Sequence, residues 1–578
     1  MLALLTLWAI LALIFTLIGM PIFHGCNLHA CLHKPEDRLF VAIWLGMITF
    51  ANLLLLTSLF IPLTLYVATF FVAIMMVPYY FKRFEILAAR PSADFLASGV
   101  LIVVTILVAA LAAIMSLKTP EDSGLYHIQM LSWLAKYGSV PGLALINNPF
   151  GYTNAWFALI APLKAEWFQD HLIMGMNSFI FYMMIVQAIV KLHRVLNRCA
   201  DIGDSFFIIS CALFCRFFFP SLIFSPSPDL PVTLLIMATA WLIIVLSLHN
   251  HATQDSTGQH RTGLSVLILA CGVVSIKIGA VPLLGVAVIY YAFAQGFSWR
   301  KAGIAVAITA LFAAIHMLVS TVTSGCPLYP APYFCSDLPW SLGADNAKQL
   351  SEETANYAKW VGTAPSDANG FNWLWHPSPN NNLYNDKPLM FGLLIANILC
   401  GAGIYLKRKT IIKDTVFYTA LIAISGIAFT LAILPHLRFG LGFFLVIPSL
   451  TGAFLLLKAT QPSSHFAFVS KKVMVPSILI AAGFSVAPIV KVELSNVASI
   501  KRIIPGVGYW GLFPMPPMQG VNKDLKLVRG NNFLYFVPSN ALCWRASILC
   551  APRYLDNVWL RDESKGFKSG FIKKPISR

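Results

Sequence analysis

The sequence predicts an all-α polytopic membrane protein, a bundle of about 12 transmembrane helices (roughly 10–14) with interfacial helices and a small C-terminal periplasmic extension. Of its 578 residues, 58% are hydrophobic and only 11% are charged. Soluble proteins carry about 25% charged residues, so this chain has too little polar surface to remain in water. Apolar runs of roughly 17–25 residues, the length that crosses a bilayer, recur along the chain. The runs at 95–117 and 415–434 are continuous, which excludes the short alternating strands of a β-barrel.

Five clusters of basic residues lie beside the apolar runs. The chain holds 41 Lys and Arg against 24 Asp and Glu, a net charge of +17. Beside membrane spans such charges set orientation and contact anionic headgroups, so we expect membrane lipids and no nucleic acid as partners. The positive-inside rule places all five clusters in the cytoplasm. The clusters are Lys82, Arg83 and Arg90; Lys191, Arg194 and Arg198; Arg300 and Lys301; Lys407, Arg408 and Lys409; and Lys471 and Lys472.

This orientation divides the chain into three parts. We assign 1–94 to N-terminal transmembrane helices, 95–490 to a transmembrane core and 491–578 to the periplasmic extension. Loops 118–153 and 321–388 of the core also face the periplasm. Prolines, aromatic residues and isolated acids concentrate in these outward segments, so we expect the chemistry there.

Three apolar stretches do not fit a simple span. The stretch 155–168 is too short to cross a bilayer and is expected to form an interfacial or re-entrant helix. The run 264–297 is too long for one helix and contains Lys277 and Pro282, so we expect two shorter helices that meet near the outer face. The stretch 2–20 lacks a basic leader and a small-residue cleavage site, so we interpret it as a retained helix.

Two cysteine pairs lie in outward segments. Cys326 and Cys335 are nine residues apart, since 335 − 326 = 9, and Cys543 and Cys550 are seven apart, since 550 − 543 = 7. In an oxidising periplasm each pair could close a small loop by a disulfide. Free buried thiols are the alternative.

The first outward loop carries two adjacent carboxylates, Glu121 and Asp122, in the segment Thr-Pro-Glu-Asp-Ser-Gly-Leu-Tyr-His, which ends at His127. A carboxylate at the membrane surface can approach a lipid-linked substrate and remove a proton from an acceptor hydroxyl. Helix capping is the alternative, because an acid at a helix start satisfies free N–H groups. The stretch 125–137 then predicts a helix whose narrow polar stripe suits the membrane interface.

A second outward turn, 225–231, holds Asp229 among prolines and serines. Proline restricts the residue before it to extended shapes, so the turn is stiff and fixes Asp229 in place. Asp229 could equally cap the helix that follows. Arg216 lies about two turns earlier, near enough to the outer surface to reach a phosphate.

Lys277 stands inside an apolar run. A buried ammonium is unstable unless it is paired, so Lys277 is expected to face a polar cavity, a carboxylate or a lipid phosphate. Snorkelling of its long side chain to the headgroups is the alternative.

The tightest outward turn, 435–440, holds His436 and Arg438 at the mouth of the bundle. Arginine binds phosphate oxygens with a two-pronged fork and keeps its charge at any working pH. A simple salt bridge at the rim is the alternative for Arg438.

The chain lacks the phosphate loop, the dinucleotide fingerprint, the zinc-protease helix and the Gly-x-Ser-x-Gly elbow. Nucleotide hydrolysis and soluble hydrolase chemistry therefore have no signature here. We predict no cofactor and no metal site. Glu121, Asp122 and Asp229 could together bind a divalent metal if they meet across the outer cavity, but the sequence does not support this because it shows no distance between them.

Six features together resemble a group of uncharacterised bacterial membrane proteins of surface-polysaccharide loci, which in turn resembles the GT-C superfamily of polytopic glycosyltransferases. The resemblance to the first group covers most of the chain from about Pro91 onward. The features are the acid followed by Ser-Gly-Leu-Tyr-His, the turn 137–142, 225–231, 324–330, the Arg438-Phe439 turn and the tail Cys543 to Cys550.

This resemblance implies a GT-C-like core in a bacterial inner membrane that transfers a sugar from a polyprenyl-phosphate-linked donor to a glycan or lipid-linked acceptor. Asp122 matches the superfamily's first-loop acid as general base, with Glu121 assisting. Arg438 or Lys277 would hold the donor phosphate, and Asp229, His127, His436 and Arg216 would line the substrate site. One departure is that about three spans precede the core here, whereas that acid usually follows the first span. An O-antigen-type polymerase or ligase and a membrane transporter are the alternatives.

Overall fold

The protein is described here from a computed structural model. The described residues are 2–81, 99–115, 120–164, 171–218, 220–252, 259–294, 296–360, 364–368, 372–374, 387–406, 413–460 and 524–574. Three of the five predicted basic clusters, those at Lys82 to Arg90, Lys407 to Lys409 and Lys471 to Lys472, lie outside these residues.

Within the described residues, eight helices are long and apolar enough to cross a membrane. The protein is therefore a helical membrane protein, whereas the expected number of about 12 crossings stays a prediction. The eight are α1 (Leu2–Gly25), α2 (Pro35–Thr57), α9 (His171–Leu196), α11 (Asp229–Ala252), α14 (Trp299–Ser324), α16 (Lys387–Leu406), α17 (Lys413–Ile433) and α18 (Leu437–Thr460). Shorter helices are α3 (Leu65–Met75), α4 (Val77–Phe81), α6 (Gly99–Met115), α10 (Ile202–Phe217), α12 (Gln259–Ile276) and α13 (Val281–Phe293).

Helices α1 and α2 pack against each other through small residues. A Cβ added to Gly19 would lie 1.8 Å from the carbonyl oxygen of Ala42, and one added to Gly46 would lie 1.9 Å from that of Phe15. Only glycine allows two backbones to approach this closely, as small residues do in membrane helix pairs. The stretch 2–20 is thus a helix of the bundle, as the sequence predicts.

The run 264–297 forms the two predicted helices, α12 and α13. They are separated at Lys277, whose backbone is extended (φ −153°, ψ 120°), and Pro282 stands in the first turn of α13, where proline is tolerated. The stretch 155–168 begins as the short helix α8 (Ala155–Ile160), and every residue of this helix is buried. It packs on α2 and on α7 (Ile128–Tyr137), so it is embedded in protein rather than lying at the interface.

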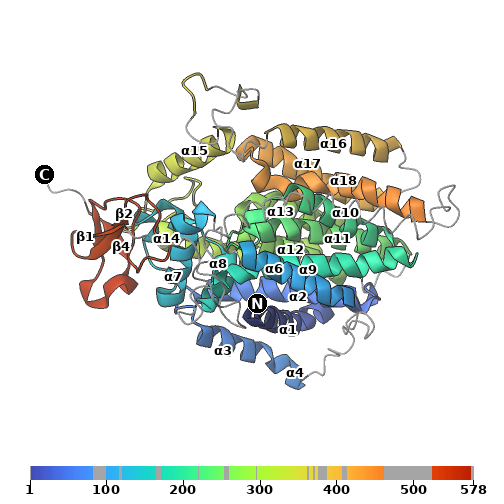
Figure 1. The fold of residues 1–578 in the computed structure, drawn as a ribbon, viewed down its shortest axis with the longest axis horizontal. Helices are drawn as coiled ribbons and strands as arrows, with labels where there is room; N and C mark the ends of the chain where they lie inside the picture. Colours follow the sequence, from blue (N-terminus) through green and yellow to red (C-terminus); the bar gives the residue numbers. More distant parts are fainter. Residues whose placement is uncertain are drawn as a thin grey trace, which may run out of the picture.

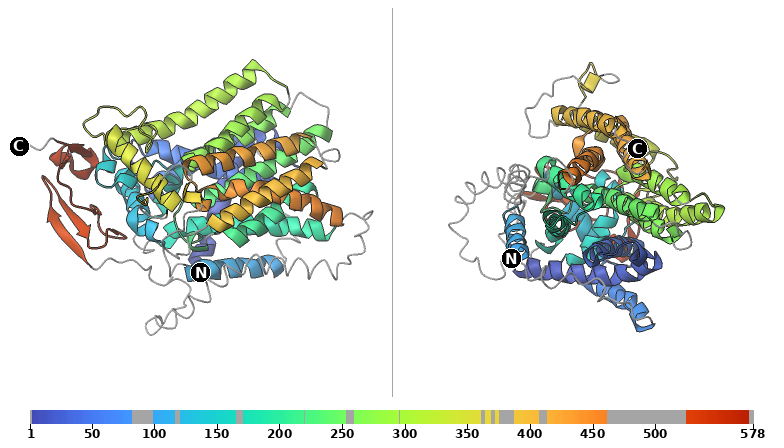
Figure 2. Two further views of the ribbon diagram at one scale, coloured as in Figure 1. Left: turned by 90° about the horizontal axis from the view of Figure 1, so that it is seen from above. Right: turned by 90° about the vertical axis from the view of Figure 1, so that its right-hand side faces the viewer.

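The segments predicted to face outward gather at one end of the bundle (Figures 1 and 2). Here α7 and α15 (Ala344–Trp360) lie beside the C-terminal extension, whose described part, 524–574, is built of strands. Strands β1 (Leu525–Arg529) and β2 (Leu534–Pro538) pair antiparallel, and so do β3 (Val558–Leu560) and β4 (Phe571–Lys573). This C-terminal module, 524–574, gives the otherwise helical chain a small β element.

The module docks on α7 through aromatic rings. Trp133 of α7 lies 5.9 Å from Phe571 and 6.1 Å from Phe567, centroid to centroid, in edge-to-face contacts. The backbone N–H of Phe571 also donates to the carbonyl of Pro141 at 2.9 Å. The extension is therefore fixed to the first outward loop.

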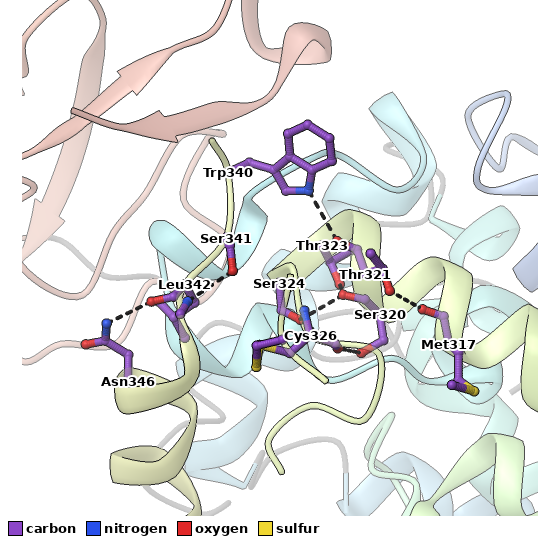
Figure 3. Close-up of a disulfide and its surroundings, with 12 residues drawn as sticks. Met317, Ser320, Thr321, Thr323, Ser324, Cys326, Trp340, Ser341, Leu342 and Asn346 are labelled. Atoms are coloured by element: carbon purple, nitrogen blue, oxygen red, sulfur yellow. Dashed lines mark hydrogen bonds between the residues drawn. A yellow bond between two sulfur atoms is a disulfide. The ribbon is translucent and has the colours of Figure 1, made fainter. Parts of the chain in front are cut away.

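Both predicted cysteine pairs form disulfides. Cys326 is bonded to Cys335, and Cys543 to Cys550. The first closes the loop after α14, where Ser320 donates to the carbonyl of Cys326 and the Trp340 indole donates to the carbonyl of Thr321 (Figure 3).

A buried network of charges holds the opposite end of the bundle. Lys191 of α9 is fully buried and contacts Asp37 at 2.9 Å and Asp204 at 3.3 Å, and its Nζ lies 4.2 Å from the centre of the Trp241 ring. Arg194 contacts both acids as well. Lys34, Glu36 and Asp201 complete this inner network, which joins α2, α9 and α10. Lys191 and Arg194 therefore lie within a helix and are paired, whereas the sequence interpretation counted them only as orienting charges.

Candidate functional site

Four helix termini bring four charged side chains together at the end of the bundle that carries the C-terminal module. Asp122 precedes the π-helical turn Ser123–His127, and Asp229 is the first residue of α11. Lys277 lies at the break after α12, and Arg438 lies in the first turn of α18. These four residues, here called the outer cluster, were all singled out in the sequence.

Arg438 is the centre of the outer cluster. Its Nη2 donates to Asp122 Oδ2 at 2.6 Å, and its Nε donates to Asp229 Oδ2. Lys277 Nζ donates to the other oxygen of Asp229. Asp229 is almost fully buried, at 3% side-chain exposure, whereas Asp122 remains 35% exposed. Two cations thus balance two carboxylates, and Asp122 is the acid that solvent or a substrate can reach.

The prolines and serines of the 225–231 turn hold Asp229 in position. Ser227 Oγ donates to Asp229 Oδ2 at 3.2 Å, and the backbone N–H of Ser227 donates to Ser225 Oγ at 3.1 Å. Ser225 Oγ also lies 3.4 Å from Ser123 Oγ, next to Asp122. Both oxygens of Asp229 accept from cations, so this acid anchors the cluster instead of serving only as a helix cap.

An aromatic ring supports the lysine. Lys277 Nζ lies 4.1 Å from the centre of the Phe439 ring, a favourable cation–π distance. Lys277 therefore pairs with a carboxylate, one of its three expected partners, and does not snorkel to the headgroups.

His127 is fully buried beside the outer cluster. Neither ring nitrogen has a hydrogen-bond partner among the described residues, and the ring lies 4.3 Å from that of Tyr126. Burial lowers the pKa of His127 from 6.5 to about 4, and Asp122 and Arg438 are among the charges that act on it. The two ring nitrogens of this buried imidazole therefore keep unused hydrogen-bonding capacity next to the outer cluster.

His436 lies on the other side of Arg438. Its Nδ1 accepts from the backbone N–H of Arg438 at 3.2 Å, and burial lowers its pKa to about 4. The ring is therefore neutral and fixes the turn that carries the arginine.

Two predicted site residues do not join the outer cluster. Glu121 is exposed and makes no ion pair with any residue in the described ranges. Arg216 places its guanidinium 5.5 Å from the ring of Phe217 and takes no part in the ion pairs around Asp229. The sequence predicts where these residues lie along the chain relative to the helix ends, but it does not tell which way a side chain points.

Sequence analysis missed the contact between α7 and the C-terminal module. Gln129 belongs to the polar stripe of 125–137 that was expected to suit the membrane interface. It is fully buried and donates to the carbonyls of Trp544 at 3.0 Å and Ala546 at 2.8 Å. The polar stripe was the available signal, but it pointed to protein rather than to the interface.

The arrangement suits binding of an anion by Arg438 and Lys277. Arg438 uses two of its five N–H donors in the described contacts, which leaves three for a ligand. No group of three or more His, Cys, Asp or Glu residues that could hold a metal ion occurs within the described ranges.

Comparison with known proteins identifies one protein family. The model of one family, described as a domain of unknown function (DUF8201), matches residues 1–445. No curated protein and no solved structure matches the chain.

Proposed function

This chain belongs to the DUF8201 family, and we propose that it is an integral membrane glycosyltransferase of the bacterial inner membrane. It would transfer a sugar from a polyprenyl-phosphate-linked donor to a glycan or lipid-linked acceptor on the periplasmic face, in the biosynthesis of surface polysaccharide or glycoconjugate. The observation that carries the proposal is the outer cluster, in which a partly exposed carboxylate shares one arginine with a buried carboxylate at the ends of membrane helices. A GT-C-like fold of the core is part of the same proposal.

In the proposed reaction, Asp122 takes the proton from an acceptor hydroxyl. The hydroxyl oxygen attacks the anomeric carbon of the donor sugar, and the bond between that carbon and the phosphate oxygen breaks. The polyprenyl phosphate leaves with the electron pair of that bond. Arg438 and Lys277 would stabilise the charge that develops on the leaving phosphate, because fixed cations act strongly in a water-poor site.

Donor binding and base activation would be linked through Arg438. Without substrate, Asp122 is ion-paired to Arg438 Nη2 at 2.6 Å. The phosphodiester of the donor carries one negative charge, as a carboxylate does, and two unesterified oxygens that can accept from the guanidinium. It can therefore take the place of Asp122 on Arg438 Nη2, and the second charge that appears on the phosphate during transfer would strengthen that contact. Asp122 would then be free to accept the proton of the acceptor, while Asp229 keeps Arg438 and Lys277 in place.

An apolar groove offers space for the isoprenoid chain. Helices α16 and α17 both pack on α18 and leave a cavity of about 1150 Å³ between them. Its floor includes Ile447, nine residues after Arg438, or about 14 Å along the helix axis. A donor whose phosphate binds at Arg438 could therefore place its isoprenoid chain in this groove.

Transport is a second candidate, favoured by the broken helix α12–α13. Transporters place charged substrates at such breaks, and Lys277 stands at this one. Substrate flux through proteoliposomes without sugar transfer would support this candidate. Transfer of whole lipid-linked oligosaccharides would instead support a polymerase or ligase.

The proposal is tested by complementation of a deletion strain with Asp122→Asn. We expect the protein to accumulate normally in the membrane while the surface glycan is lost and a lipid-linked intermediate, measured by mass spectrometry, builds up. Replacement of a general base typically lowers rate by about 10²- to 10⁴-fold. Glu352→Gln, an exposed acid of α15, is the matched control and should restore the glycan. Normal glycan with Asp122→Asn would refute the proposal.

A further inference from the structure

The segment that carries Asp122 is held by a loop more than 400 residues later in the chain, since 544 − 124 = 420. The backbone N–H of Trp544 donates to the carbonyl of Gly124 at 3.0 Å. On the following turn, Gln129 Nε2 donates to the carbonyls of Trp544 and Ala546. One hydrogen bond therefore joins the loop to the turn Ser123–His127, and two join it to the first turn of α7, which follows directly.

The Trp544 side chain and the backbone of Gly124 are in close van der Waals contact. A Cβ added to Gly124 would lie 2.4 Å from Cδ2 and Cε2 of the Trp544 indole. The ring thus packs flat on the backbone of Gly124, two residues after Asp122. Glycine is required here by close approach and not by its backbone conformation, since its φ is not positive.

The loop itself is fixed at both ends. The Cys543–Cys550 disulfide closes it, and its last residues join β2, where Phe536 N–H donates to Leu549 and Ala551 N–H donates to Phe536. Strand β4 is in turn bonded to Pro141, beyond α7. The C-terminal module therefore contacts the first outward loop at two places, Gly124 before α7 and Pro141 after it, and links them.

We propose that the disulfide-closed loop 543–550 positions Asp122 against Arg438 by clamping the turn Ser123–His127. Trp544 and Gln129 are positioning residues in this scheme, since neither belongs to the outer cluster. The proposal has a structural arm, that the loop holds the turn, and an activity arm, that this contact supports catalysis. Only the activity arm rests on the proposed transferase function. A disulfide needs an oxidising compartment, so the site would be completed only after the C-terminal module has reached that side of the membrane.

The structural arm is tested by hydrogen–deuterium exchange on the full-length protein in lipid nanodiscs. Gln129→Leu removes two of the three hydrogen bonds, and Cys543→Ser/Cys550→Ser opens the loop that carries their partners. In both variants we expect amides of the turn to exchange faster by about tenfold or more. The matched control is Cys326→Ser/Cys335→Ser, which opens the other outward loop and should leave this exchange unchanged. Unchanged exchange in both test variants would overturn the proposal, whatever the enzymatic activity is.

The activity arm uses a rescue that separates positioning from stability. Gly124→Ala should clash with the Trp544 ring and lower both the unfolding temperature and sugar transfer. Adding Trp544→Ala makes room and should restore the unfolding temperature, while kcat stays low by up to about 10²-fold with KM little changed. Restoration of kcat together with stability would show that the contact only stabilises the fold and would overturn the positioning role. If no variant, including wild type, transfers sugar while the exchange result holds, the proposed function fails and the clamp stands.

Discussion

Replacement of Asp229 by asparagine tests whether this acid is the anchor of the outer cluster. The side chain is 3% exposed and accepts hydrogen bonds from both Lys277 and Arg438. Asparagine keeps the shape but removes the charge, so two neighbouring cations would share only Asp122. Breaking a buried ion pair from one side is destabilising by about 3–5 kcal/mol. Asp122→Asn breaks a single pair with a side chain that is 35% exposed, for which about 0–1 kcal/mol is expected.

The two variants should therefore differ in stability, although the proposed function expects both acids to be needed for activity. We expect Asp229→Asn to unfold at a clearly lower temperature than Asp122→Asn in the same detergent, with a difference in free energy of about 3 kcal/mol. The measurement is thermal unfolding followed by intrinsic fluorescence and by the fraction of monodisperse protein. Glu352→Gln serves as the neutral control.

A second substitution makes the test sharper. Lys277→Met removes the cation that Asp229→Asn deprives of its carboxylate, whereas Arg438 keeps its ion pair with Asp122. The double variant should therefore recover part of the lost stability, with a coupling of about 1–3 kcal/mol between the two positions. Equal unfolding temperatures for Asp229→Asn and Asp122→Asn, or losses that simply add in the double variant, would refute the anchor role.

Three further outcomes are expected. Burial lowers the pKa of His127 from 6.5 to about 4, so between these pH values the unfolded chain binds a proton that the folded protein does not. The free energy of unfolding should therefore fall by up to about 3 kcal/mol as the pH drops from 6.5 to 4. His127→Gln should weaken that pH dependence in unfolding scans. Lys191→Met leaves Asp37 and Asp204 short of a partner and should destabilise the fold by about 3 kcal/mol, while KM and kcat of the folded fraction stay at wild-type values. Gly46→Val should force α1 from α2 and lower stability by about 1–3 kcal/mol or more, whereas Gly403→Val, with no atom within 4 Å of its Cβ position, should have little effect in the same unfolding assay.

The members of the outer cluster could be found from sequence because charge is scarce in this chain. A charged group in an apolar segment needs a partner, so Lys277 within an apolar run was expected to face one. Asp229 was singled out because prolines make its turn stiff, and no cation was assigned to it. The break between α12 and α13 was predictable for the same reason, since a lysine and a proline interrupt one long run. What the sequence lacks is the lateral order of the helices, and so it could not say that Arg438 meets both Asp122 and Asp229.

The errors have the same origin. The positive-inside rule counts Lys191 and Arg194 without asking whether an acid on another helix faces them, and Asp37 and Asp204 do. The polar stripe of α7 is correct, but periodicity shows only which face is polar, not what covers it. Gln129 is covered by a module that the sequence placed nearby only as an unspecified extension.

The two charged networks differ in a way that separates binding from scaffolding. In the inner network Lys191 is fully buried and Asp204 is 1% exposed, and their charged atoms are taken up by one another. In the outer cluster Arg438 is 17% exposed and keeps donors that no described residue uses, and His127 beside it has two unpartnered nitrogens. Unused hydrogen-bonding capacity next to buried charge is unfavourable for a scaffold but necessary for a site that must accept a ligand. Two neutral atoms beside the inner network, Ser205 Oγ and Trp241 Nε1, are also without a partner among the described residues, so the difference between the networks lies in their charged groups. Arg438 keeps N–H donors that no described residue uses and Asp122 is 35% exposed, and these two features are the physical reason to look for chemistry at the outer end of the bundle.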